Sequence, residues 1–288
     1  RRARPGRADA RRDGNAKEPR RSSQRPAPAG LATLWPPTPR PGQASEVRRV
    51  ALCVLIRADA SSAIGVGHVM RCLAVAQALA EQGAAILFAC VELPGTVRSQ
   101  LLENGFAVTD IPGPAGGAED LAATAALAHS AAAVILDGYR FGEDYRAALR
   151  ASSQGPVLAF DDNAELGALH AGLIVNAAPD ADKLGYPAKA PGAVLLLGPA
   201  YAPIRRDIRL AAALAPLDWA ARDRILVTFG GSDPLGLTGP VMALLAEKLP
   251  GVGVDVAVGG GNPRVEALKA LAALLGPQIA LHIDARQM

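Results

Sequence analysis

Residues 56–79 read IRADASSAIGVGHVMRCLAVAQAL, in which an apolar run leads through a polar, glycine-rich loop into a helical pattern. The apolar run begins at Val50 and predicts a buried strand. Apolar residues at helical spacing follow the loop, and Gly83 ends the predicted helix. A strand, a loop and a helix in this order are typical of a parallel α/β sheet, where ligands bind beyond the carboxyl ends of the strands.

This loop and the start of its helix carry the residues best suited to chemistry, namely Asp59, Gly65, Gly67, His68 and Arg71. Glycines permit a tight turn and present backbone N–H groups at a helix N-terminus, which attracts a phosphate or a hydroxyl group. The positive end of the helix dipole favours the neutral imidazole that a general base needs. His68 is therefore the first candidate for a catalytic base. The alternative is a histidine that only forms hydrogen bonds within the turn.

Strands and helices alternate from residue 50 onward, which predicts parallel strands joined by right-handed crossovers. The first group of strands is predicted at 50–56, 84–90, 106–110, 133–137, 156–160, 172–176 and 193–197, with helices at 67–82, 95–104, 117–130 and 142–152. The second group is predicted at 224–229, 252–258 and 278–283, with helices at 236–249 and 262–275. We therefore expect an α/β fold with two Rossmann-like parallel sheets.

The chain is predicted to divide into four parts. Residues 1–49 form a basic tail rich in Pro and Arg, 50–198 an N-terminal Rossmann-like domain, 199–222 a connection that contains a helix, and 223–288 a C-terminal domain. The tail composition is typical of a disordered segment, and an RNA- or membrane-binding tail is the alternative. Because the last part offers only three strands, we expect its sheet to be incomplete and the chain to be truncated at its C-terminus.

Charge is distributed unevenly along the chain. Residues 1–49 carry 13 Lys and Arg against 4 Asp and Glu, whereas the remainder carries 17 against 23. The mildly acidic body argues against a nucleic-acid surface. No apolar run approaches the roughly 20 residues of a membrane span. Cys53, Cys72 and Cys90 show no metal-ligand spacing and fit buried thiols of a cytoplasmic protein.

Polar residues end several of the predicted strands and are expected to line the same crevice. Asp137 and Tyr139 follow the fourth strand, where Asp137 can orient His68 or bind a sugar hydroxyl. Asp161 and Asp162 end the fifth strand, and adjacent strand residues point to opposite faces, so the two carboxylates are not expected to share a metal. We expect one of them to face the substrate. Asn176 ends the next strand in the same way.

Two glycine clusters end strands of the second group. Gly230, Gly231 and Ser232 precede a predicted helix, and a second cluster at 259–261 follows the next strand. Backbone N–H groups in such loops can hold a phosphate, which favours a nucleotide diphosphate; the alternative is a plain turn. In GVGHVM, Met70 occupies the position of the third glycine of GxGxxG, so the dinucleotide signal is weak. The sequence contains no GxSxG, HExxH or P-loop motif.

Five blocks in fixed order resemble the UDP-sugar hydrolase family of pseudaminic acid biosynthesis, which is related to spore-coat polysaccharide proteins. After the opening stretch these blocks are LDGYRF, FDD, LLGPAYAPIRRDI and FGGSDP. The resemblance runs from about residue 50 to the end of the chain. It implies a GT-B-like fold and hydrolysis of a UDP-activated diacetamido-trideoxy altropyranose to free sugar and UDP.

The resemblance also implies roles for individual residues. His68 would be the general base that activates water at the anomeric carbon with inversion, with Tyr139 and Asp59 in the catalytic group. Gly138 stands where the family often has a histidine. Substrate contacts are expected from Gly65, Gly67, Arg71, Asp137, Asp162, Asn176, Gly230, Gly231 and Ser232, without a metal or cofactor.

Two alternatives remain open from the sequence. One is a GT-B glycosyltransferase that transfers the sugar of a UDP-sugar to an acceptor. The other is an inactive fragment that only binds. In each reading the partner is a UDP-sugar, with no nucleic acid and no membrane, and the protein is expected to be a monomer.

Overall fold

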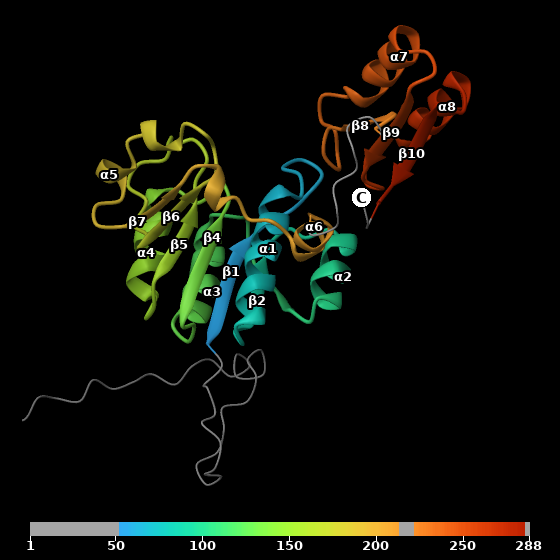
Figure 1. The fold of residues 1–288 in the computed structure, drawn as a ribbon. Helices are drawn as coiled ribbons and strands as arrows, with labels where there is room; N and C mark the ends of the chain where they lie inside the picture. Colours follow the sequence, from blue (N-terminus) through green and yellow to red (C-terminus); the bar gives the residue numbers. More distant parts are fainter. Residues whose placement is uncertain (1–51, 213–221, 286–288) are drawn as a thin grey trace, which may run out of the picture.

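The computed structural model describes residues 52–212 and 222–285, which form two parallel sheets flanked by helices (Figure 1). The predicted tail at 1–49 and part of the predicted connection lie outside these residues. The first sheet has the strand order β3-β2-β1-β4-β5-β6-β7. Its strands are β1 (Cys53–Ala58), β2 (Ala85–Cys90), β3 (Ala107–Asp110), β4 (Ala133–Asp137), β5 (Val157–Phe160), β6 (Leu173–Asn176) and β7 (Val194–Leu197).

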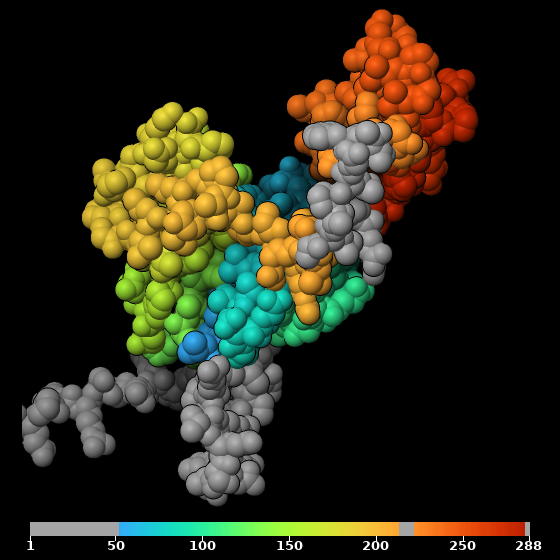
Figure 2. Space-filling view, viewed as in Figure 1, coloured from blue at the N-terminus to red at the C-terminus, as the bar shows by residue number. Residues whose placement is uncertain are grey.

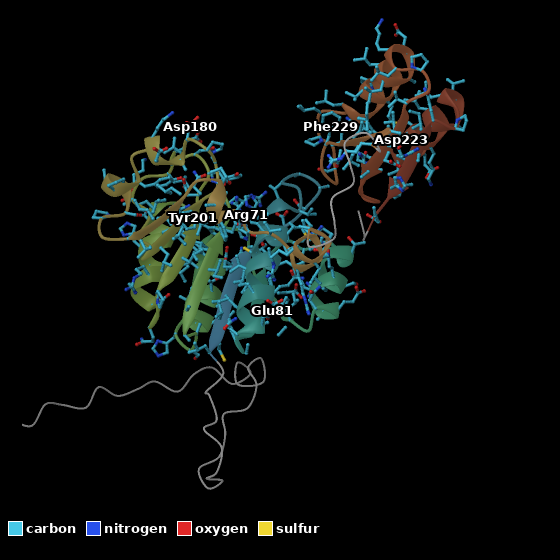
Figure 3. All side chains as sticks on the ribbon, in the orientation of Figure 1. Arg71, Glu81, Asp180, Tyr201, Asp223 and Phe229 are labelled. Atoms are coloured by element: carbon cyan, nitrogen blue, oxygen red, sulfur yellow. The ribbon has the colours of Figure 1, made fainter. Side chains whose placement is uncertain are left out.

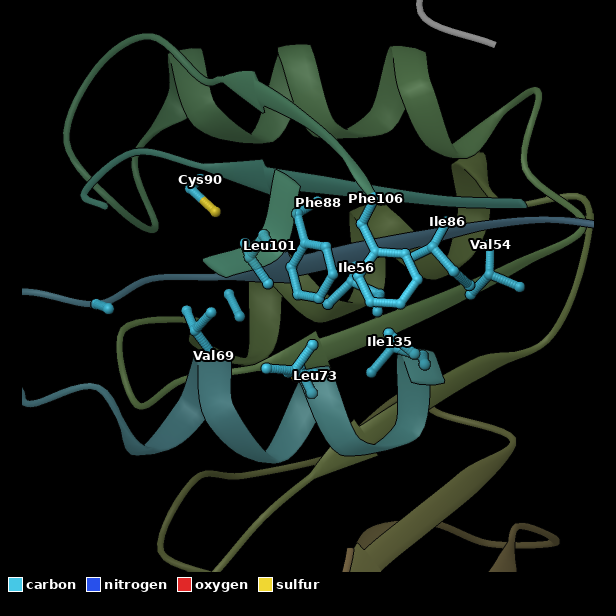
Figure 4. Close-up of a cluster of buried hydrophobic side chains, with 14 of the residues drawn as sticks. Val54, Ile56, Val69, Leu73, Ile86, Phe88, Cys90, Leu101, Phe106 and Ile135 are labelled. Atoms are coloured by element: carbon cyan, nitrogen blue, oxygen red, sulfur yellow. The ribbon is translucent and has the colours of Figure 1, made fainter. Parts of the chain in front are cut away.

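Helices cover both faces of the first sheet because its strands are apolar on both sides. The helices α1 (Gly67–Glu81) and α2 (Gly95–Glu103) pack on one face, and α3 (Ala118–Ala128) and α4 (Glu143–Ser152) on the other. Figure 4 shows the core on the α1 side, where Ile56 and Phe88 of the sheet meet Val69 and Leu73 of the helix. Burial on both faces is typical of a parallel sheet.

The strand order reverses direction between β1 and β4, which makes the edge above these two strands the switch point of the sheet. Strand β1 pairs in parallel with β2 on one side and with β4 on the other, and Ala58 is level with Asp137. The loops that leave β1 and β4 therefore diverge to opposite faces and leave a crevice between them. Residues after β1, β4 and β5 face this crevice.

The second sheet has the order β10-β9-β8 within residues 222–285. Its strands are β8 (Arg224–Thr228), β9 (Gly253–Val258) and β10 (Ile279–Ile283), and α7 (Thr238–Lys248) and α8 (Val265–Leu275) pack on one face around Val254 and Val256. Between the sheets, α6 (Arg206–Ala212) lies on α1, since the Arg206 N–H donates to Gln77 and Arg209 contacts Glu81. Figure 2 shows this contact at the surface.

The α/β fold class with two parallel sheets is confirmed, and each predicted strand is present with bounds that differ by a few residues. Two helices start later than predicted. Helix α7 begins at Thr238, because the Gly236 N–H donates to the Asp233 carbonyl in a turn in which Gly236 has a φ of 68°. Helix α8 begins at Val265. Sequence periodicity did not predict the short helix α5 (Tyr186–Lys189) between β6 and β7.

A buried ion pair joins β1 to α3 beneath the switch point. The fully buried Arg57 guanidinium donates to both carboxylate oxygens of Asp120, at 2.9 and 2.8 Å, and lies 2.8 Å from Asp59. Thr124 and Tyr145 also donate to Asp120. Burial alone would lower the pKa of Arg57, but these carboxylates outweigh it and raise that pKa. The pair fixes the start of α3 against the sheet.

We predict that Asp120→Asn lowers the free energy of unfolding by about 3 to 5 kcal/mol, because it leaves a buried charge without its main partner. Urea unfolding followed by circular dichroism measures this loss. The matched control is Asp110→Asn, which removes an exposed partner of Arg98 and should cost at most about 1 kcal/mol. Equal losses in the two variants would contradict a stabilising role for the buried pair.

Candidate active site

Polar side chains from α1 and from the ends of β4 and β5 meet at the switch point. His68 and Arg71 lie in the first turns of α1, Asp137 ends β4, and Tyr139 and Asp162 follow β4 and β5. Figure 3 places Arg71 near one end of α1 and Glu81 near the other, so the polar group lies at the carboxyl edge of the sheet. Five of the predicted site residues are therefore neighbours.

His68 and Asp137 form a direct hydrogen bond, with 2.8 Å between Nδ1 and Oδ1. Asp137 is fully buried and His68 is 8% exposed. A carboxylate oxygen accepts hydrogen bonds, so the contact with Asp137 favours the tautomer with the proton on Nδ1, although Arg71 Nη2 also lies 3.3 Å from that nitrogen. The Nε2 lone pair of the neutral ring is then free to take a proton from a bound molecule. A histidine held in this way by a carboxylate is arranged as a general base.

The Arg71 guanidinium bridges the two carboxylates of the site. It donates to Asp137 from Nε at 2.5 Å and from Nη2 at 2.6 Å, and to Asp162 from Nη1 at 2.7 and 3.0 Å. It also lies 4.8 Å from the centroid of the Phe160 ring. Partial burial would lower the pKa of Arg71, but the two carboxylates raise it. Arg71 is thereby held as a fixed cation between them.

Tyr139 lies over the histidine and is tied to the second carboxylate. Its hydroxyl donates to Asp162 at 2.6 Å, and its ring meets the His68 ring edge-on at 4.8 Å between centroids. Burial and the neighbouring Asp162 carboxylate raise the pKa of Tyr139 to about 12. The phenol therefore stays protonated at neutral pH and can donate but not act as a base.

A hollow opens beside these rings and is lined by Asp59, Ile64, His68, Gly138, Tyr139, Arg140 and Phe141. Its cavity volume is about 30 Å³, which is room for a water molecule, and the rest of the hollow is open to solvent. Gly138 has a φ of 151°, and a Cβ there would lie 2.9 Å from the Phe141 ring. The family's histidine at this position would therefore strain the hollow.

Asp59, predicted as catalytic, is held by structural contacts. Its Oδ1 accepts hydrogen bonds from the N–H groups of Val91 and Glu92, at 2.7 and 3.1 Å, and also meets Arg57. These contacts tie the loop after β1 to the loop after β2. A direct catalytic role of Asp59 stays a prediction. In the structure, Asp59 is one of the residues that line the hollow.

Asn176, which is predicted to bind substrate, is buried, and both polar atoms of its side chain form hydrogen bonds with protein groups. Its Nδ2 donates to the Asp162 carbonyl at 3.0 Å and to the Tyr186 hydroxyl at 2.8 Å, and its Oδ1 accepts from the Ala178 N–H. These bonds join the ends of β5 and β6. Substrate contact by Asn176 stays a prediction.

The two glycines of the first loop leave room above His68. Gly65 has a φ of 77° and closes a tight turn with Ser61 through hydrogen bonds in both directions. Gly67 begins α1, and a Cβ at either glycine would have open space around it. The turn therefore brings backbone close to any molecule that lies against the His68 ring.

The glycine loops of the second sheet lie against one another. The Gly259 N–H donates to the Gly231 carbonyl at 3.0 Å, and a Cβ at Gly259 would lie 2.6 Å from that oxygen. Gly230 is exposed with a φ of 76°, and Ser232 is half-buried. These residues precede α7 by several positions, so they form a loop and not the first turn of the helix.

The carboxylate of Asp233 caps the N-terminus of α7. Its carboxylate accepts hydrogen bonds from the N–H groups of Leu237 and Thr238, both at 2.9 Å, and from the Thr238 hydroxyl. Burial would raise the pKa of Asp233, but these donors hold it below its usual range. The N-terminus of α7 is thus filled by this chain's own carboxylate, and anion binding by Gly230, Gly231 and Ser232 stays a prediction.

Several residues of the site carry no signal that sequence reasoning detected. Cys72 donates its thiol to Asp137 at 3.6 Å, and burial raises its pKa well above the usual range. Tyr186 holds Asp161 from a short helix that periodicity missed. Their partners are distant in sequence, and one chain without homologues gives no sign of such pairs.

Within 52–212 and 222–285, no three His, Cys, Asp or Glu side chains gather as a metal site. Over the same ranges, no helix has the length and apolar character needed to cross a bilayer.

We predict that Asp162→Asn destabilises the protein at neutral pH and does so less as the pH falls. Partial burial would raise the pKa of Asp162, but Arg71 and Tyr139 lower it. A carboxylate of this kind stabilises the fold above its unfolded pKa of about 3.9, and this contribution is lost as the pH falls through the lower folded pKa.

Urea unfolding of the wild type and Asp162→Asn at pH 6 and pH 3 measures this effect, with the exposed Asp182→Asn as the control. A difference between wild type and Asp162→Asn that stays constant from pH 6 to pH 3 would rule out an ionised Asp162–Arg71 pair.

Several solved structures are similar to this chain at low sequence identity. HepE of Anabaena, solved in complex with UDP-glucose, is 14% identical with a TM-score of 0.50, over 81% of this chain and 69% of HepE. MurG of Acinetobacter baumannii is 19% identical with a TM-score of 0.46, over 81% of this chain and 65% of MurG. A glycosyltransferase of Rickettsia africae is 13% identical with a TM-score of 0.49, over 83% of this chain and 70% of that enzyme.

No protein-family model and no curated protein sequence matches the chain. The likeness to HepE concerns the fold, and it agrees with the GT-B-like arrangement of two parallel sheets that the sequence predicts. The chain thus has a GT-B-like α/β fold, with a carboxylate-bound histidine at the switch point of its first sheet.

Proposed function

We propose that the protein is an enzyme that acts on a nucleotide sugar and displaces the nucleoside diphosphate from the anomeric carbon. The observation that carries this proposal is the buried Asp137–His68 pair, which leaves the Nε2 lone pair free beside the hollow. A base at this place serves an attacking hydroxyl group. The carboxylate behind the ring stabilises the imidazolium that forms.

The proposed step is a single displacement. The oxygen of the nucleophile bonds to the anomeric carbon while the bond between that carbon and the diphosphate oxygen breaks, which inverts the configuration. The proton of the nucleophile passes to Nε2 of His68, and the bonding electrons leave with the diphosphate. A nucleoside diphosphate is a stable leaving group, so the step differs from glycosidases that need a second carboxyl group as acid.

The diphosphate is proposed to lie on the second sheet. Arg57 and Arg71 are each paired with two carboxylates, and Arg140 is paired with Glu92, so the arginines of the first crevice are already neutralised. The loop of Gly230, Gly231 and Ser232 offers backbone N–H groups next to a close glycine contact. HepE, which shares the fold, is described with UDP-glucose, and this supports UDP as the nucleotide.

Two nucleophiles are consistent with the proposed base, and different observations favour them. The shared fold with glycosyltransferases supports transfer of the sugar to an acceptor hydroxyl group, which is our first candidate. The ordered blocks from IRADASSAIGVGHVMRC to FGGSDP support water, and with it hydrolysis of the UDP-activated diacetamido-trideoxy sugar. His68 would take the proton in either reaction.

We predict that the purified protein releases UDP from a UDP-sugar, and that added acceptor identifies the nucleophile. The test measures UDP from UDP-glucose, the sugar nucleotide described with HepE, and from the UDP-diacetamido-trideoxy sugar, each with and without a mixture of monosaccharide acceptors. Release that rises with acceptor supports transfer, and release that acceptor leaves unchanged supports hydrolysis. No release from either donor would overturn the proposal.

We predict that His68→Asn lowers kcat by about 10² to 10⁴-fold, because general base catalysis contributes about this factor. UDP affinity, measured by calorimetry, should stay near the wild-type value, since the diphosphate is proposed to lie on the second sheet. His129→Asn is the control, because His129 is exposed at the end of α3. Wild-type turnover in His68→Asn would remove this residue from the mechanism.

A further inference from the structure

A buried tyrosine behind the crevice holds the backbone that carries Asp162. The Tyr186 hydroxyl lies 2.8 Å from Asp161 Oδ1 and 2.9 Å from the Asp161 carbonyl, and it accepts a hydrogen bond from Asn176 at 2.8 Å. Its side chain is fully buried. Tyr186 belongs to α5, which is outside the three strands that end at the crevice.

We infer that Tyr186 is a positioning residue that fixes the direction of the Asp162 carboxylate, and through it Arg71 and Tyr139 around His68. This inference deepens the proposed function and rests on it for its effect on turnover. The residue itself touches neither the hollow nor the proposed reacting atoms. It acts through Asn176 and the backbone of residues 161–162.

The backbone contacts explain how a distant hydroxyl group can control a carboxylate. Asp161 turns inward, where it accepts hydrogen bonds from Tyr186 and from the Ala164 N–H at 2.6 Å, whereas Asp162 turns to Arg71. Asn176 donates to the Asp162 carbonyl from the amide that also meets Tyr186. Both residues directly follow the end of β5, so holding the Asp161 side chain and carbonyl inward also fixes the backbone from which Asp162 reaches Arg71.

Two further features show that the side chain of Asp161 is constrained. Ala164 has a φ of 54°, a strained conformation for alanine, and the hydrogen bond to Asp161 holds it there. The Arg146 guanidinium lies 3.9 Å from Asp161 on the far side, buried and without a hydrogen-bond partner at Nε and Nη1. Asp161 is thus held between the Tyr186 hydroxyl and a buried cation, and loss of the hydroxyl lets it turn toward Arg146.

From Asp162 the effect reaches His68 along two contacts. Arg71 links Asp162 to Asp137, which holds Nδ1 of His68, and the Tyr139 hydroxyl links Asp162 to the ring that lies against His68. A carboxylate that loses its direction loosens both contacts. A displacement of about 1 Å at reacting groups can cost about 100-fold in rate.

The test replaces Tyr186 with Phe, which removes only the hydroxyl group, and compares it with Tyr145→Phe. Tyr145 is also buried, and its hydroxyl also donates to a carboxylate, Asp120 at 2.9 Å. Both variants are measured for urea stability, for kcat, KM and the pH dependence of UDP release, and for the side-chain ring N–H signal of His68 by NMR. His68→Asn assigns that signal.

We expect Tyr186→Phe to lower kcat about 10- to 100-fold with little change in KM. The acid limb of its pH profile should shift, because the contacts that hold His68, the proposed base, are loosened. The His68 ring N–H signal should exchange faster with solvent. Tyr145→Phe should lose stability with none of these changes. Equal kcat, pH profile and ring signal in the two variants would overturn the inference.

The NMR measurement separates this inference from the proposed function. If the wild type releases no UDP, the proposed function fails, yet the His68 ring N–H still reports whether Tyr186 holds the site. Unchanged exchange in Tyr186→Phe would then overturn the positioning role by itself. Faster exchange in Tyr186→Phe alone would support it without any turnover.

Discussion

A single guanidinium lies between the two carboxylates of the crevice, and the arrangement of the proposed base depends on it. Arg71 donates to both oxygens of Asp137 and to both oxygens of Asp162, so the two carboxylates are paired with the same cation. Asp137 in turn accepts a hydrogen bond from Nδ1 of His68 in the tautomer that leaves Nε2 without a proton.

The topology of the first sheet brings these groups together. Asp137 is 69 positions from His68 in the sequence, and Asp162 is 91 positions from Arg71. Parallel pairing places Ala58 level with Asp137, so β1 and β4 end at the same height. Because the chain reverses its direction of winding between these strands, their loops part and leave the edge open. The sheet thus supplies both the carboxylate and the space above it.

Much of the fold could be predicted from the sequence, whereas the pairing of side chains could not. The strands are apolar runs of strand length bounded by polar residues, which is a local signal. Asp161 and Asp162 do point in the opposite directions that the sequence predicts, as the contacts to Tyr186 and Arg71 show, although both residues follow the end of β5. By contrast, Arg57 lies within an apolar strand, and its partner Asp120 is 63 positions away. Nothing local indicates such a pair.

The distribution of charge explains why, under the proposed function, proton transfer and diphosphate binding would take place on different sheets. The first crevice holds its arginines in ion pairs that shape a base, which leaves them poorly suited to bind a diphosphate. The Asp233 carboxylate accepts hydrogen bonds from the N–H groups at the start of α7, so these donors are already used within the chain. The glycine loop before it presents backbone donors without a fixed charge. Under the proposed function, proton transfer and anion binding thus fall to different sheets, and neither set of charges opposes the other.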